Sequence, residues 1–146
     1  MAQFYSIDAA NERLAELRPL LERLRAQRDD LVRLRDLAVD RISAVEARGE
    51  SGAGRTGPTI EPDDDEELRR IRMRMQGIID QMQAAVSQID DWGIMLRDIE
   101  TGLVDFPALV SGRQIWLCWR LGEGDVAFWH ELTTGFGSRR PLTEVA

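Results

Sequence analysis

The sequence predicts an α+β fold: a long antiparallel hairpin of two helices with a small three-stranded antiparallel sheet at the C-terminal end. Two observations lead to this fold. Apolar residues recur every three or four positions through residues 8–48 and 63–92, and most aromatic residues come after this pattern stops. The length of 146 residues fits a single domain over residues 1–146, and a hydrophobic content of 43% is enough for a packed core.

The first helix is expected over residues 8–48. Ser6 or Asp8 can cap it by accepting hydrogen bonds from the free amides of the first turn. Pro19 lacks an amide hydrogen, so the helix is expected to kink or restart near residues 16–18. The apolar stripe of this helix consists of Leu14, Leu17, Leu21, Leu24, Leu31, Leu34, Ala38, Ile42 and Val45.

A flexible linker rich in glycine and proline is expected over residues 49–62, where it reverses the chain. The second helix, residues 63–92, begins with five consecutive acids, which suit the positive end of the helix dipole. A divalent-cation site built from these acids is the less favoured alternative. Downstream, apolar residues alternate at spacings of three and four, which is typical of a coiled coil and predicts a partner helix.

The remaining structure is expected in a β-region over residues 93–141, because Gly93 is placed to end the second helix. Residues 113–121 and 125–132 read as a β-hairpin around a short turn at residues 122–125. A third short strand is expected near residues 94–99. The simplest register of the hairpin sets Leu121 opposite Val126.

This register assigns the hairpin side chains to two faces of the sheet. His130 then lies opposite Leu117 and shares a face with Trp119 and Phe128. Cys118 lies opposite Trp129 and shares the other face with Trp116. The interpretation favoured for His130 is therefore a buried histidine that is hydrogen-bonded to Asp105 or Asp98.

Charge and composition limit the classes of function. The formal net charge is −7, and nonspecific nucleic-acid binding needs a basic face, so no nucleic-acid partner is expected. The sequence contains no Lys, which excludes lysine Schiff bases and a phosphate-loop lysine. We expect neither a secretory leader nor a membrane span. Cys118, the single cysteine, fits a cytoplasmic location.

The polar and aromatic residues of the β-region form a candidate ligand or partner surface. A divalent-metal site could combine His130 with Asp105 and Glu123, but no two ligands stand at a typical metal-ligand spacing. Nucleophilic catalysis by Cys118 with His130 is disfavoured because the predicted register puts them on opposite faces. The candidate residues are Asp98, Asp105, Arg113, Trp116, Cys118, Glu123, Trp129 and His130.

Four motifs of the β-region occur in a recognisable order. They are Gly-Leu-Val-Asp-Phe-Pro at 102–107, Leu-Cys-Trp-Arg-Leu-Gly-Glu at 117–123, Trp-His at 129–130, and Gly-Phe at 135–136 with Arg139 and Pro141. Together with Ala10-Asn11 and Pro19, they resemble the bacterial family called domain of unknown function 2203. The late motif departs from the family pattern, because Gly137-Ser138 stands where an Ala-Gly pair is expected. The resemblance implies a family but no activity.

The favoured hypothesis is a noncatalytic oligomeric or interaction protein without a cofactor. Its helical hairpin would form a homodimer, and its aromatic β-region would present a surface to a protein partner. The alternative is a small divalent-metal-binding protein or metal-dependent enzyme with a site around His130, Asp105 and Glu123. No catalytic constellation is identified, so the enzyme is the less favoured reading.

Overall fold

The computed structural model describes residues 3–51 and 65–144. It contains two long helices and an antiparallel sheet, which confirms the mixed α+β class. The chain forms two compact units. We call Met1–Ala26 together with Gln83–Ala146 the sheet unit, and Gln27–Met82 the hairpin unit.

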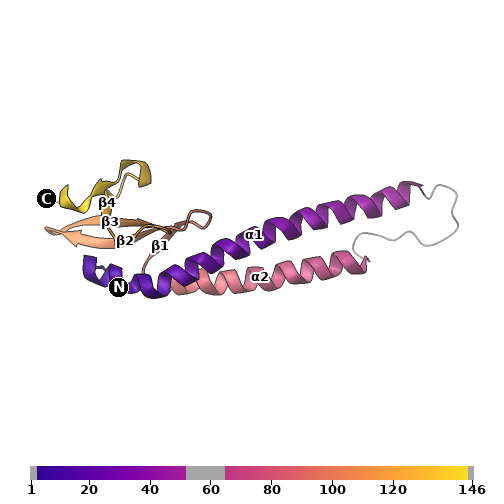
Figure 1. Ribbon diagram of the computed structural model, residues 1–146, viewed down its shortest axis with the longest axis horizontal. Helices are drawn as coiled ribbons and strands as arrows, with labels where there is room; N and C mark the ends of the chain where they lie inside the picture. The colour runs from indigo at the N-terminus through magenta and orange to yellow at the C-terminus, as the bar shows by residue number, and fades with distance from the viewer. Residues whose placement is uncertain (1–2, 52–64, 145–146) are drawn as a thin grey trace. The chain divides into compact units, whose positions relative to one another are not determined.

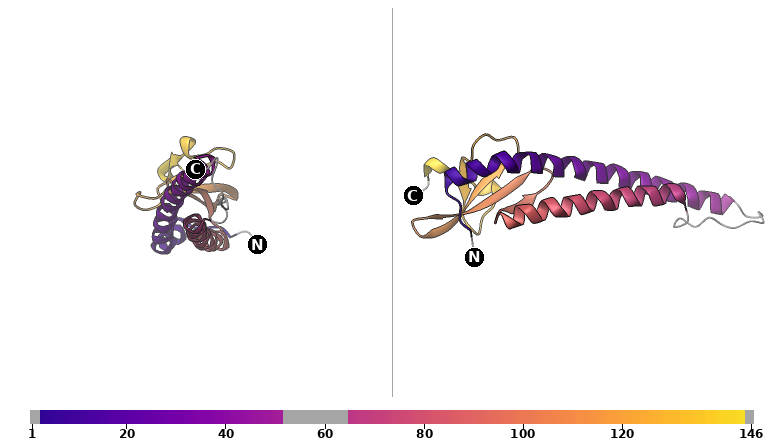
Figure 2. Two further views of the ribbon diagram at one scale, coloured as in Figure 1. Left: turned by 90° about the vertical axis from the view of Figure 1, so that its right-hand side faces the viewer. Right: turned by 90° about the horizontal axis from the view of Figure 1, so that it is seen from below.

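The hairpin unit is built from the middle and end of α1 (Ile7–Ser51) and most of α2 (Glu66–Asp91). The two helices run antiparallel in this unit, as Figures 1 and 2 show. The Gln27 side-chain amide donates to Gln81 Oε1 over 2.9 Å. Near the other end of the unit, Arg41 is paired with Asp65. Residues 49–51 of the expected linker continue α1, and its remaining residues lie outside the described part of the chain.

Both helices begin at a side-chain cap. Ser6 Oγ accepts a hydrogen bond from the Ala9 amide at 3.0 Å, as the sequence predicted. Asp65 caps α2 by accepting from the Leu68 amide at 3.0 Å. Of the two outcomes expected near Pro19, the restart is wrong, because α1 continues through this residue, and the kink stays a prediction. Proline removes one hydrogen bond, while buried leucines such as Leu17 and Leu21 on the same stripe hold the helix in place.

The expectation of three strands is wrong, because the sheet formed by the described residues has five antiparallel strands in the order β1-β2-β3-β4-β5. The strands are β1 (Met95–Asp98), β2 (Leu103–Val110), β3 (Arg113–Arg120), β4 (Phe128–His130) and β5 (Arg140–Pro141). No strand was predicted at the position of β2, which has Pro107 in its middle. The pairing of β1 with β2 stops at Asp105, so no β1 residue lies opposite Pro107. The Pro107 carbonyl accepts a hydrogen bond from the Tyr5 amide at 2.7 Å, and the missing amide hydrogen of proline costs the sheet no hydrogen bond here.

A two-residue turn joins β2 to β3. Ser111 and Gly112 both have positive φ, 53° and 76°, and they connect the paired residues Val110 and Arg113. Two positive φ values are the mark of a type I′ turn, whose twist matches that of the strands. The Ser-Gly dipeptide was therefore the sequence signal for the missed hairpin.

The predicted register of β3 and β4 is wrong by one residue. Cys118 pairs with Phe128, and Trp116 pairs with His130. The residues expected to close the hairpin make other contacts: the Leu121 amide donates to the Gly102 carbonyl, and the Val126 amide donates to Asn11 Oδ1 at 2.7 Å. Because side chains alternate along a strand, a shift of one residue exchanges the two faces.

The inner face of the sheet is apolar and packs against the N-terminal turns of α1. Tyr5 contacts Phe106 edge to face at 5.1 Å between ring centroids. This face consists of Val104, Phe106, Ala108, Ile115, Leu117, Trp119 and Trp129, all buried.

The outer face carries Asp105, Trp116, Cys118, Phe128 and His130. The C-terminal segment passes over it, and Figure 1 shows this segment and the start of α1 on opposite sides of the sheet. In the described part of the chain, neither helix has the length and apolar character needed to span a membrane.

Candidate metal centre

Three side chains of different chemistry meet on the outer face of the sheet. Asp105 of β2 lies directly opposite Cys118 of β3, and His130 of β4 lies one pair further along. Their relative exposures are 3%, 1% and 3%. The carboxylate oxygen, the thiol sulfur and the imidazole nitrogen all lie within 4.8 Å of one another. The sheet register thus brings together residues separated by 25 positions in sequence.

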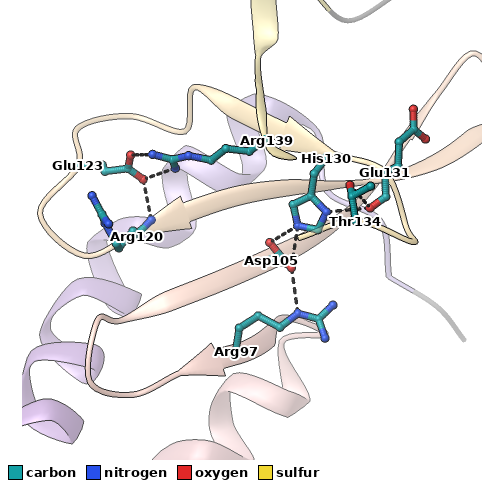
Figure 3. Close-up of polar contacts among 8 residues, drawn as sticks. All are labelled: Arg97, Asp105, Arg120, Glu123, His130, Glu131, Thr134 and Arg139. Atoms are coloured by element: carbon teal, nitrogen blue, oxygen red, sulfur yellow. Dashed lines mark hydrogen bonds and ion pairs between the residues drawn. The ribbon is translucent and has the colours of Figure 1, made fainter. Parts of the chain in front are cut away.

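His130 is held at both ring nitrogens (Figure 3). Nδ1 lies 2.7 Å from the Glu131 carbonyl oxygen, and Nε2 lies 3.0 Å from each oxygen of Asp105. A carbonyl oxygen and an ionised carboxylate only accept, so both Nδ1 and Nε2 are donors in these hydrogen bonds. Nε2 is the nitrogen that faces the cluster. The predicted hydrogen bond between His130 and Asp105 is confirmed, whereas the predicted packing of His130 beside Trp119 is wrong, because Trp119 is on the inner face.

Arg97 is a second partner of the buried carboxylate. Its Nε donates to Asp105 Oδ2 at 2.9 Å, and its guanidinium lies 5.0 Å from the centroid of the Trp116 ring. The pairing of β1 with β2 shifts between Leu96 and Asp98, so Arg97 is the extra residue of a β-bulge. Bulges commonly re-aim a side chain in this way. The Arg97 side chain remains 38% exposed and thus reaches from solvent to the cluster.

Cys118 is a protonated thiol in this environment. Burial and the adjacent negative charge of Asp105 raise its pKa to about 12, despite an opposing effect of Arg139. A nucleophilic cysteine needs a lowered pKa, so the site does not suit cysteine catalysis. Cys118 and His130 share a face of the sheet, contrary to the prediction, and it is burial that makes cysteine catalysis unfavourable here.

Glu123 lies in the loop after β3 and is clamped by arginine. Arg139 donates to its two carboxylate oxygens at 2.9 and 2.6 Å, and the Arg120 amide donates to it at 2.7 Å (Figure 3). Burial alone would raise the pKa of Glu123, but these hydrogen bonds lower it below the ordinary value. Arg139 also stacks on Phe128, 4.0 Å from its centroid. Glu123 therefore fastens the C-terminal segment over the outer face and is not part of the three-residue cluster.

The other predicted surface residues lie outside the cluster. Asp98 accepts from the amide and hydroxyl of Thr101 and shapes the turn after β1. Arg113 is paired with Glu131 at 3.0 Å. Trp129 is buried on the inner face, and Trp116 is half-buried on the outer face above the cluster.

Arg97 was not among the predicted site residues. No local pattern marked it, because its position depends on the bulge in β1. Arg139 was quoted only as part of a motif, and its pairing with Glu123 spans 16 residues across the C-terminal segment. Both contacts are tertiary and have no signature in sequence spacing.

The family model described as Uncharacterized conserved protein, DUF2203, matches residues 3–142 of the chain. This match spans both units and every residue of the cluster. No curated protein and no solved structure matches the chain significantly.

Proposed function

We propose that this chain, which belongs to the DUF2203 family of uncharacterised conserved proteins, binds one divalent transition-metal ion through Asp105, Cys118 and His130. The observation that carries the proposal is the convergence of the three ligand atoms within 4.8 Å. Tetrahedral Zn²⁺ with ligands at 2.0–2.3 Å requires ligand atoms roughly 3.3–3.8 Å apart. A small adjustment of the side chains would therefore admit the ion.

The ligand types favour zinc or a similar ion over magnesium or calcium. Mg²⁺ and Ca²⁺ prefer sets of oxygen ligands, whereas a mixture of sulfur, nitrogen and oxygen suits Zn²⁺ and Co²⁺. Cys118 is the residue that distinguishes a metal site from a simple hydrogen-bonded pair of His130 and Asp105. The hydrogen bond between His130 and Asp105 needs no thiol, yet the register aligns Cys118 with the carboxylate.

The orientation of His130 also supports metal binding. Histidine ligands usually donate one ring N–H to a carbonyl or carboxylate, which fixes the tautomer and directs the other nitrogen to the metal. Here Nδ1 donates to the Glu131 carbonyl, so Nε2 is available once its contact with Asp105 is replaced by the ion. Binding would displace two protons, the thiol proton of Cys118 and the Nε2 proton of His130, because a coordinated thiol is deprotonated and a coordinating imidazole nitrogen carries no proton.

The test is a titration of the full chain, purified without a histidine tag, with Co²⁺. We expect one ion per chain and a thiolate-to-cobalt charge-transfer band in the near ultraviolet. Cys118→Ser should remove this band and weaken binding at least about tenfold, because even the loss of an outer partner of a ligand costs that much. Asp98→Asn is the matched control, since it removes a carboxylate of the same sheet outside the cluster.

Either of two results would refute the proposal. One is a spectrum equal to that of hydrated Co²⁺ in the wild type. The other is an unchanged charge-transfer band in the Cys118→Ser variant. A thermal melt of each metal-free variant establishes that the comparison is made between folded proteins.

Self-association of the hairpin unit is a second candidate function. Leu37 and Met73 of this unit are 54% and 69% exposed. Two paired helices bury one face each, and a second copy of the chain could cover these side chains in a four-helix bundle. This proposal is independent of the metal site, and light scattering tests it.

A further inference from the structure

We infer that the metal ion carries a small oxyanion from solution, such as a carboxylate, in its fourth position, and that Arg97 holds this anion. The inference rests on the proposed metal site and adds the class of ligand that the site accepts. The observation that supports the inference is the position of Arg97, whose partly exposed guanidinium is hydrogen-bonded to Asp105 of the buried cluster.

Three protein ligands leave one position of a tetrahedral ion open. Within the described residues, the group able to hold a metal comprises Asp105, Cys118 and His130. The polar side chain that adjoins Asp105 from β1 is Arg97, and a guanidinium is always protonated and cannot ligate a metal. When each of the three cluster residues supplies one ligand atom, the fourth ligand comes from outside these side chains.

The charges of the site favour an anion as this ligand. A thiolate and a carboxylate together neutralise a divalent ion, and the imidazole is neutral when it coordinates. The positive charge of Arg139 is balanced by Glu123, and that of Arg113 by Glu131. Asp105 balances Arg97 only until the same carboxylate binds the ion. An anion between the ion and Arg97 restores the balance of charge.

The geometry of Arg97 suits an oxyanion. Its Nε donates to Asp105, and Figure 3 draws no contact between its two terminal nitrogens and the other labelled residues. The outer edge of a guanidinium offers parallel N–H donors that match carboxylate and phosphate oxygens. Contact with the Trp116 ring fixes the plane of the group, and the exposed fraction leaves it accessible to solutes.

The experiment uses the Co²⁺-loaded full chain and follows its visible spectrum while acetate replaces perchlorate at constant ionic strength. A second series uses inorganic phosphate at concentrations that leave the bound cobalt content unchanged. We expect a saturable spectral change with acetate, phosphate or both, because ligand replacement at the open position alters the cobalt bands. Arg97→Gln should weaken the anion affinity about tenfold, the value of one charge-assisted hydrogen bond.

Arg140→Gln is the matched control. It removes the same charge from an arginine near Trp129, 5.5 Å from that ring, on the inner-face side of the sheet. A cobalt spectrum that depends on Cys118 but ignores both anions would overturn this inference and leave the metal site standing, with water as fourth ligand. Equal anion affinities in wild type and Arg97→Gln would also overturn it. If the wild type binds no Co²⁺ at the cluster, the proposed function itself fails.

Discussion

Asp105 is a buried carboxylate that depends on its neighbours. Placing a carboxylate in a protein interior is costly unless hydrogen bonds and opposite charge compensate for lost water. His130 and Arg97 provide this compensation in the metal-free protein, at 3.0 and 2.9 Å. In the metal-bound protein that we propose, the ion takes over the role of the His130 proton.

The effect of His130 on stability can be separated from its effect on metal binding. With chelator present, we expect His130→Leu to lower the free energy of unfolding by about 2–4 kcal/mol, because it leaves Asp105 with one fewer partner. His130→Asn keeps a donor at this position and should cost roughly half as much. Urea denaturation of the two variants measures this difference. Equal losses would show that hydrogen bonding to Asp105 is not what His130 contributes.

At the scale of elements, the sequence predicted the two helices well and the sheet poorly. Helical periodicity is a local signal, and the observed α1 and α2 lie within a few residues of the predicted ranges. The register of β3 and β4 depends instead on Asn11 and Gly102, which are far from the hairpin in sequence. Because a one-residue shift exchanges faces, this small error separated Cys118 from His130 in the prediction.

The candidate site could be predicted only in part, because the strand register decides which side chains meet. Asp105 and His130 were proposed together from their chemistry, and their hydrogen bond is present. Glu123 was proposed as their companion, but it is clamped by Arg139. Cys118 takes its place in the cluster because β2 and β3 pair in a register that sets Asp105 opposite Cys118. The presence of Cys118 in the cluster could not be predicted, because strand β2 was not predicted.

The acidic start of α2 has a measurable role in the hairpin unit. The Arg41 guanidinium and the Leu68 amide, both donating to Asp65, lower the pKa of this carboxyl to about 2 from its ordinary value of 3.8. The folded state thus favours the charged form. The stabilisation is complete well above the unfolded pKa and is lost as the pH falls from about 4 towards about 2.

We therefore expect Asp65→Asn to destabilise the protein at neutral pH and to reduce the loss of stability between pH 5 and pH 2. Chemical denaturation at a series of pH values measures both effects. Glu66→Gln is the control, because the Glu66 side chain is 64% exposed and surface pairs contribute little. Parallel pH profiles for Asp65→Asn and the wild type would contradict this account of the cap.

At the scale of the whole molecule, the proposed dimer predicts a mass of about twice 16.6 kDa in size exclusion coupled to light scattering. Leu37→Glu combined with Met73→Glu should shift the protein to the monomer, because both side chains are exposed in the hairpin unit and charges would oppose burial. Ser43→Glu is the control, because Ser43 is also exposed in this unit and lies about 120° around α1 from Leu37. A wild type that stays monomeric at high micromolar concentration would refute self-association.

X-ray absorption at the zinc edge can show whether Asp105, Cys118 and His130 together bind one ion. Full-length protein loaded with one equivalent of Zn²⁺ should show one sulfur neighbour at about 2.3 Å and nitrogen or oxygen neighbours at about 2.0–2.1 Å. Cys118→Ser should lose the sulfur shell. A zinc environment of nitrogen and oxygen alone in the wild type, or zinc that washes away on buffer exchange, would contradict the account.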